Sequence, residues 1–147
     1  MTRILLRYCE LLDTGRTDQI AGEVYAADAV ADYNFEVLEG AAAIHAFLVA
    51  NMAAFKEVAH ALTNVDVKFC DGQRADVRSM MTAWHWIEKS QGDPAAAPAS
   101  FAQIVICEDR LELRPEGWRV VQHRARALGP STMLQAGSIT MTRGEEA

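Results

Sequence analysis

The histidine with the clearest interior position in the sequence is His85. It lies near the end of a fourteen-residue stretch, Arg74 to Ile87, in which small or apolar side chains alternate with larger, more polar ones. Successive side chains of a strand point to opposite sides of the sheet, so His85 shares its face with Met81 and Ala83. Imidazole gains or loses a proton near neutral pH. We therefore predict a pocket lined by Met81, Ala83 and His85; a buried structural histidine is the alternative.

Other common catalytic and binding motifs are missing from the sequence. The three cysteines, Cys9, Cys70 and Cys107, are far apart and odd in number, so they predict neither a disulfide framework nor a CxxC metal site. No group of cysteine, histidine and carboxylate residues has the spacing of metal ligands. There is also no glycine-rich phosphate loop and no GxSxG motif. We therefore expect no bound metal.

The composition is that of one globular domain with a real core. The chain has 147 residues, of which 50% are hydrophobic and 23% charged. A net charge of −6 argues against nucleic acid or an anionic membrane surface as the main partner. We find no apolar run of about 18 residues and no signal-peptide pattern. Together with the cysteine usage, this predicts a protein of the reducing cytoplasm.

The first third of the chain has helical periodicity broken by one short strand region. The spacing of apolar residues predicts helices over residues 3–13 and 17–25, and a third helix from Gly40 to about Phe55. Residues 29–33 are expected to form a short strand, with residues 35–38 pairing back onto it. The three predicted helices therefore all lie before the long strands of the sequence.

Beyond this point the period becomes that of strands. Long strands are expected over residues 58–69, 74–87, 101–113 and 118–128, the first two joined by an Asp71-Gly72 hairpin turn. Residues 91–100 are a proline-containing loop, expected to be mobile. The pattern predicts an α+β domain over residues 1–128, with a curved antiparallel sheet packed against three N-terminal helices. Residues 129–147 have no clear period and are expected to be a tail or an arm that packs on a partner.

Five segments in this order resemble a known family. They are RYCELLDTG at 7–15, YAADAVADY at 25–33, LEGAAAIHAFL at 38–48, HALTNVDVKFCDGQRAD at 60–76 and EGWRVVQHR at 116–124. The chain resembles the SnoaL-like group of the nuclear-transport-factor-2-like superfamily, which includes polyketide cyclases, scytalone dehydratase and bile-acid dehydratases. The resemblance implies a cone-shaped domain with a deep, mostly apolar pocket. It also implies chemistry without a metal or organic cofactor.

The resemblance further assigns candidate site residues by position. Family dehydratases use a histidine paired with an aspartate, and these would be His60 and Asp13. Tyr33 would be a pocket tyrosine, and His85 a second pocket histidine. Tyr8 also lies where some dehydratases have a tyrosine. For Tyr33, a core tyrosine bonded to a neighbour is the alternative.

The face of the strand on which His60 lies is the main difficulty for this assignment. On a regular strand His60 shares its face with Asp66 and Lys68, which is the polar side. His60 can face a pocket only if a β-bulge near Thr63-Asn64 exchanges the two faces, and we predict that bulge. The alternative is a structural histidine at the start of the strand.

Two further predictions concern the last strand and the outer face of the sheet. His123 and Arg124 point to opposite sides of their strand, and we expect Arg124 to be the one that binds substrate. Trp84 and Trp86 share the outer face with Arg78. Aromatic residues on an outer face usually mean a covered surface, so we expect a homodimer through these tryptophans. A harmless exposed pair is the alternative.

These expectations lead to one preferred function and one alternative. The preferred function is binding of a small, mostly apolar cyclic or polyketide-like carbonyl compound, followed by acid–base chemistry by His60 and Asp13. Dehydration is the preferred reaction, ahead of cyclisation and isomerisation. The alternative is a non-catalytic module that binds a ligand or docks a partner subunit, because one fold can host many functions.

Overall fold

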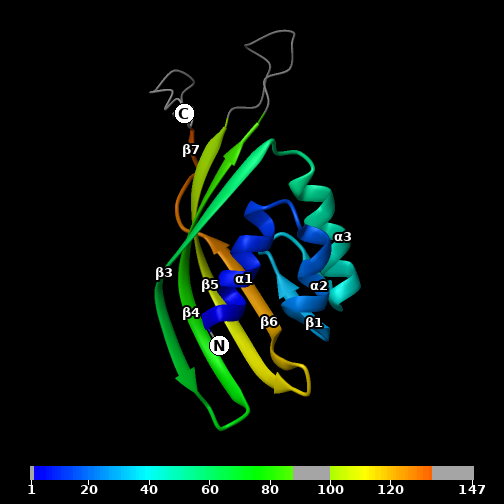
Figure 1. Cartoon of the computed structure of the whole chain (residues 1–147). Coiled ribbons are helices and arrows are strands. Elements are labelled where there is room, and N and C mark those ends of the chain that lie inside the picture. The colour runs from blue at the N-terminus through cyan, green and yellow to red at the C-terminus, as the bar shows by residue number, and fades with distance from the viewer. Residues whose placement is uncertain (1, 88–99, 134–147) are drawn as a thin grey trace, which may run out of the picture.

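The protein is a curved sheet with a layer of helices against one face (Figure 1). The computed structural model describes residues 2–87 and 100–133. The helical elements are α1 (Thr2–Asp13), η1 (Thr17–Gln19), α2 (Ile20–Glu23) and α3 (Ala41–Met52). The strands are β1 (Tyr25–Asp32), β2 (Val37–Glu39), β3 (Glu57–Phe69), β4 (Arg74–Trp86), β5 (Phe101–Arg114), β6 (Gly117–Ala127) and β7 (Thr132–Met133). This arrangement confirms the predicted α+β class.

The sheet is mixed rather than wholly antiparallel. Its strand order is β2-β1-β6-β5-β4-β3, and β7 pairs with β5. Neighbouring strands run antiparallel except β1 and β6, which are parallel. The start of the expected tail, Thr132–Met133, therefore adds to the protein's own sheet. Residues 134–147, and nearly all of the expected loop 91–100, lie outside the described residues.

Strand β4 is paired on both sides along almost its whole length. Its residues are alternately buried and more exposed from Arg74 to Trp86, as the sequence alternation predicts. Ser79 and His85 are on the buried face, which packs toward the helices, with 1% and 9% exposure. The hairpin at Asp71-Gly72 is also confirmed, because Phe69 and Ala75 pair across it.

A bulge in β3 exchanges the two faces of that strand, as predicted. The pairing of β3 with β4 shifts between Thr63 and Asp66, and Asn64 has a φ of 50°. Asparagine is one of the few residues that enters this left-handed region readily. Before the bulge His60 is paired with Ala83 of the buried face, and after it Val67 is paired with Val77 of the same face. His60 therefore faces the helices.

The boundaries near the second helix differ from the prediction. The helix expected to reach Tyr25 ends at Glu23, and Tyr25 already pairs with Val120 of β6. The Val120 amide donates to the carbonyl of Val24 at 2.9 Å, and Tyr25 is only 3% exposed. The hydrogen bonds of Val24 and Tyr25 to the long strand β6 stabilise an extended chain there, and a helix as short as α2 has too little stability of its own to continue against them.

The core lies between the helices and the inner face of the sheet. Its most deeply buried large side chains come from both layers and are Leu11, Ile20, Val24, Ile44, Leu111 and Val120. Gly40 starts α3 with a φ of 84°, a conformation that glycine adopts without strain. Among the described helices, none combines the length and the apolar character needed to cross a lipid bilayer.

Candidate functional site

Asp13 is placed by the way helix α1 ends. The Arg16 amide donates to the Leu11 carbonyl at 2.8 Å, and the Gly15 amide donates to the Leu12 carbonyl at 3.1 Å. With Gly15 at a φ of 70°, this is a Schellman motif, which ends the helix and turns the chain sharply away. Asp13 is thus the last helical residue and projects toward the neighbouring strand β3.

His60 and Asp13 make two contacts. The His60 ring nitrogen Nδ1 lies 2.6 Å from Asp13 Oδ1, and the His60 backbone amide donates to Asp13 Oδ2 at 3.1 Å. The His60 side chain is 3% exposed and that of Asp13 is 29% exposed. The predicted pair therefore forms, with its histidine buried and its carboxylate partly in water.

This contact sets what the His60 ring can do. A carboxylate accepts a hydrogen bond from Nδ1–H, which favours the tautomer whose other nitrogen, Nε2, is free to take a proton. The carboxylate also stabilises the imidazolium that forms when Nε2 is protonated. Because Asp13 lies at the negative end of the α1 dipole, a positive partner is favourable there. The pair is arranged as a base assisted by an aspartate.

His85 lies beside this pair on the same face of the sheet. The rings of His60 and His85 are 5.9 Å apart and perpendicular, and the His85 ring lies 4.5 Å from that of Phe55 and 4.6 Å from that of Phe101. Burial, and secondarily the neighbouring His60, lowers the pKa of His85 to about 4. His85 is therefore neutral at neutral pH. Its buried Nδ1 has no hydrogen-bond partner among the described residues.

Tyr33 and Tyr8 are not part of this group. The Tyr33 ring lies 5.3 Å from His123 and stacks on Phe47 at 4.8 Å. Tyr8 lies 6.1 Å from His123. The residues expected to form one site are thus divided between a His60 group and a group around His123. Burial raises the pKa of Tyr33 and of Tyr8, so both hydroxyls keep their protons at neutral pH.

The expectation that Arg124 rather than His123 faces the interior is wrong. His123 is 6% exposed, whereas the Arg124 side chain is 55% exposed and pairs with Asp32 at 3.5 Å on the outer face. A second bulge explains the error, because the pairing of β5 with β6 shifts between Val120 and Gln122. A regular strand would place Arg124 on the same side as the core residue Val120. The extra residue, Val121, instead places Arg124 on the outer face and His123 on the inner face.

A second histidine–aspartate pair was missed by the sequence reasoning. His123 Nδ1 lies 2.7 Å from Asp109 Oδ1, with side-chain exposures of 6% and 3%. The only signal was the alternation of β5, which puts Asp109 on one side with Cys107 and Leu111, both core residues. A carboxylate on an apolar face is informative, because a buried charge needs a partner.

The inner hollow of the described residues is small. A cavity of about 20 Å³ lies between α1 and the sheet, and Tyr8, Met81 and His123 are among its lining residues. Ala83 is buried opposite His60 but is not part of this lining. The described residues therefore do not show the substrate-sized pocket that was expected. Met81 and Tyr8 do line an interior cavity.

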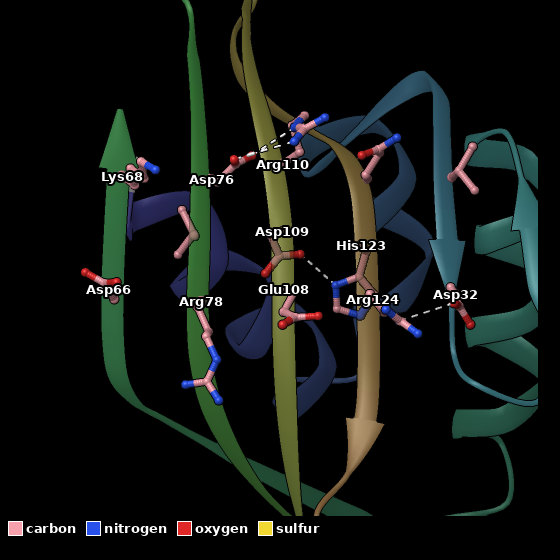
Figure 2. A pocket seen from close by; sticks show the side chains of 13 residues that line it. Asp32, Asp66, Lys68, Asp76, Arg78, Glu108, Asp109, Arg110, His123 and Arg124 are labelled. Carbon is pink, nitrogen blue, oxygen red and sulfur yellow. Dashed lines mark hydrogen bonds and ion pairs between the residues drawn. The ribbon is translucent and has the colours of Figure 1, made fainter. Parts of the chain in front are cut away.

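One of the surface hollows of the described residues is a groove on the outer face of the sheet. It has a volume of about 530 Å³ and is rich in charged side chains, such as Asp76, Arg110 and Arg124. Figure 2 shows Asp76 paired with Arg110 and Arg124 paired with Asp32, with the helices behind the sheet. These side chains largely neutralise one another across the strands.

Metal binding has no visible basis in the described ranges, 2–87 and 100–133. No group of three or more histidine, cysteine, aspartate or glutamate side chains could hold an ion there. Each histidine–aspartate pair supplies only two such side chains.

Comparison with known proteins places the chain in a sequence family. A family model described as a SnoaL-like domain matches residues 1–124, which is most of the chain. No curated protein sequence matches this chain.

Solved structures of the same fold include several with enzyme names. One is a candidate scytalone dehydratase from Novosphingobium aromaticivorans, with a TM-score of 0.77 and 18% identity over 98% of this chain and 92% of that one. Another is a hexachlorocyclohexane dehydrochlorinase from Novosphingobium barchaimii, with a TM-score of 0.75 and 13% identity over 95% and 90%. A candidate dehydratase of the NTF2-like family from Streptomyces avermitilis has a TM-score of 0.71 and 17% identity over 88% and 94%. At sequence identities this low, the structural similarity shows only that these proteins share the fold of this chain.

Proposed function

This chain belongs to the SnoaL-like domain family, and from that premise we propose that it is a lyase that removes water from a cyclic carbonyl compound. The observation that carries the proposal is the 2.6 Å contact between His60 and Asp13, with the imidazole buried beside a neutral His85. A buried imidazole with an aspartate on one nitrogen is a suitable general base. The proposal assigns that role to His60.

The reaction is an elimination next to a carbonyl group. His60 Nε2 takes a proton from the carbon beside the carbonyl, and the electrons of that C–H bond form the new C=C bond. The C–O bond to the hydroxyl on the next carbon breaks, and its electron pair leaves with the oxygen. The protonated His60 returns its proton to this oxygen, so that water leaves and the base is regenerated. Asp13 stabilises the intermediate imidazolium.

His85 is proposed to polarise the carbonyl of the substrate. Because its low pKa keeps the ring neutral, His85 carries one N–H that can donate to the carbonyl oxygen without adding a charge. Its position next to His60, Phe55 and Phe101 favours an apolar ring as the neighbouring part of the substrate. The neighbours described as a dehydratase and a dehydrochlorinase are named for the loss of water and of hydrogen chloride. That chemistry supports an elimination here.

The proposal is tested with two β-hydroxy ketones of different size, 3-hydroxycyclohexanone and 3-hydroxy-1-tetralone. Loss of water from the second gives 1-naphthol after tautomerisation, which is followed by its absorbance. We expect the protein to accelerate at least one reaction over the same concentration of free histidine, with a primary kinetic isotope effect when the carbon beside the carbonyl carries deuterium. Binding of these compounds without any turnover would instead favour the non-catalytic ligand-binding alternative.

A further inference from the structure

The inner face of the sheet contains a second buried histidine–aspartate pair that the proposed reaction does not use. His123 Nδ1 lies 2.7 Å from Asp109 Oδ1, and the two side chains are 6% and 3% exposed. They point toward one another from the neighbouring strands β6 and β5 (Figure 2). An ionised carboxylate only accepts hydrogen bonds, so Asp109 keeps the proton of a neutral His123 on Nδ1 and leaves Nε2 as an acceptor. A donor for Nε2 must therefore come from elsewhere.

Two buried polar atoms in this region lack a hydrogen-bond partner. They are His123 Nε2 and the Ser79 hydroxyl oxygen, and neither bonds to any group in the part of the chain that the structure describes. Ser79 is 1% exposed and His123 is 6% exposed, so bulk water does not reach them. Most buried side-chain polar atoms in proteins do have a partner, and an unpartnered one costs stability. Both atoms therefore indicate a group from outside the chain.

Ser79 and His123 lie on strands at either side of β5. Ser79 of β4 pairs with Cys107, and His123 of β6 pairs with Asp109, two residues further along β5. Adjacent strands are about 4.8 Å apart, so the backbones of β4 and β6 are separated by roughly 10 Å. This separation explains why the serine and the imidazole make no direct hydrogen bond. A bridge between them requires a small molecule in the space that both side chains face.

The space that Ser79 and His123 share is the inner cavity of about 20 Å³ between α1 and the sheet. A single water needs about 10–15 Å³ of such volume, so the cavity has room for one water and nothing larger. Tyr8, Tyr25 and Asp109 also line the cavity and bring further polar groups to its walls. A buried water typically makes two to four hydrogen bonds. The cavity therefore has both the size and the polar lining that such a water needs.

We propose that this cavity binds one water, which donates to His123 Nε2 and bonds to the Ser79 hydroxyl. The water joins β4 to the Asp109–His123 pair of β5 and β6, so three strands share one polar network beneath α1. It also stabilises the register that the bulge after Val120 creates, because a slip of β6 by one residue would take the imidazole off the inner face. The site is independent of the reaction proposed for His60.

The water is tested in the intact protein by two substitutions of Ser79 that differ in size. Ser79→Ala removes the hydroxyl and leaves the cavity open, so the water stays. Ser79→Val fills the space with methyl groups and expels the water, which leaves His123 Nε2 unpaired. In a dry cavity valine would be the more stable of the two, because it buries more apolar surface and favours strands. We expect the reverse order of urea midpoints, and a valine variant at or above the alanine variant would overturn the proposal.

A background without the histidine–aspartate pair is the matched control. His123→Leu with Asp109→Val removes both polar partners together, so no buried charge is left alone. In this background Ser79→Val should have a higher urea midpoint than Ser79→Ala, because no Nε2 remains to be left unpaired. An order that stays reversed would show that valine is too large for the site, and would contradict the proposal.

The water is also detected directly, whatever the stability of the variants. The ¹⁷O relaxation of the solvent is measured as a function of magnetic field, which reports waters held inside a protein for longer than the protein takes to tumble. The wild type and Ser79→Ala should each hold one internal water more than Ser79→Val. Equal signals from the wild type and Ser79→Val would show that the cavity is dry and would overturn the proposal.

Discussion

Two histidines of the inner face differ in their hydrogen-bond and aromatic partners. His60 has a carboxylate on Nδ1, which favours the tautomer whose Nε2 is free to accept a hydrogen bond or a proton. His85 has aromatic rings on two sides and no partner on Nδ1 among the described residues, so its charged form is disfavoured. Two identical side chains, 5.9 Å apart, are thereby suited to different tasks. One can take a proton, and the other can donate a hydrogen bond as a neutral group.

The low pKa of His85 predicts a dependence of stability on pH. In the unfolded chain a histidine has a pKa of about 6.5, whereas folded His85 has one of about 4. Between these values the unfolded state binds the extra proton, so stability falls as pH decreases from about 6.5 to 4. His85 contributes a loss on the order of 3 kcal/mol over this window. Above pH 6.5 its contribution is constant.

The measurement is the free energy of unfolding in urea between pH 7.5 and 4 for the wild type and for His85→Phe. The variant should lose less stability on acidification, because phenylalanine does not titrate and is an apolar ring like its neighbours Phe55 and Phe101. Acidic groups with lowered pKa values, such as Glu10 and Asp76, affect both proteins alike. Identical pH profiles would show that His85 is not held neutral.

At the scale of elements, two bulges decide which side chains face the helices. The bulge at Asn64 turns His60 inward, and the bulge after Val120 turns His123 inward and Arg124 outward. Without the first, His60 would lie on the charged outer face and could not reach Asp13. Bulges commonly re-aim side chains next to functional sites. The positions of both histidines are therefore properties of strand irregularities.

The conformation of Asn64 can be tested directly. Asn64→Ala should destabilise the fold by about 1 kcal/mol, because alanine is strained at a φ of 50°. Asn64→Gly should cost less or nothing. Both variants lose the contact of Nδ2 with the Met80 sulfur, so the difference between them isolates the backbone effect. Lys68→Ala, at an exposed position of the same strand, is the control, and urea midpoints measure all three. An alanine variant as stable as the glycine variant would contradict this account.

The two bulges also show what the sequence can predict. In β3 the polar run after His60 conflicts with an inward histidine, and this conflict indicated a bulge. In β6 both Val120 and Val121 are apolar, so shifting the alternation by one residue leaves an equally plausible pattern. Helices and long strands could therefore be predicted from their periodicity, and the pair of His60 with Asp13 from the resemblance to the SnoaL-like group. The His123 pair could not, because its register depends on an irregularity without a local signal.

For the whole molecule, the outer face of the sheet is divided into two regions. Charged side chains line the groove near Asp76 and Arg110. Toward the end of β4 the same face carries Trp84, Trp86 and Ile104, of which Trp86 and Ile104 are 37% and 41% exposed. Exposed aromatic and aliphatic side chains gathered on a sheet are typical of covered surfaces. We propose that this region pairs two copies of the chain.

The oligomeric state tests this proposal. Light scattering after size-exclusion chromatography should give the mass of a dimer for the wild type and of a monomer for Trp84→Ser with Trp86→Ser. Phe35→Ser changes an apolar residue that is 78% exposed elsewhere, and it should remain dimeric. A monomeric wild type, or a double variant that is still dimeric, would exclude this interface.

The central claim, that His60 takes a proton from carbon with the help of Asp13, is tested most directly without any leaving group. Exchange of hydrogen for deuterium at the carbon beside the carbonyl of 1-tetralone in D₂O is followed by NMR, with His60→Ala and Asp13→Asn as variants. We expect the wild type to exchange at least about 100-fold faster than His60→Ala, the usual contribution of a general base. Asp13→Asn should also be slow, because its amide can donate to Nδ1 and leave Nε2 protonated. Equal exchange rates for the wild type and a correctly folded His60→Ala protein would contradict the account.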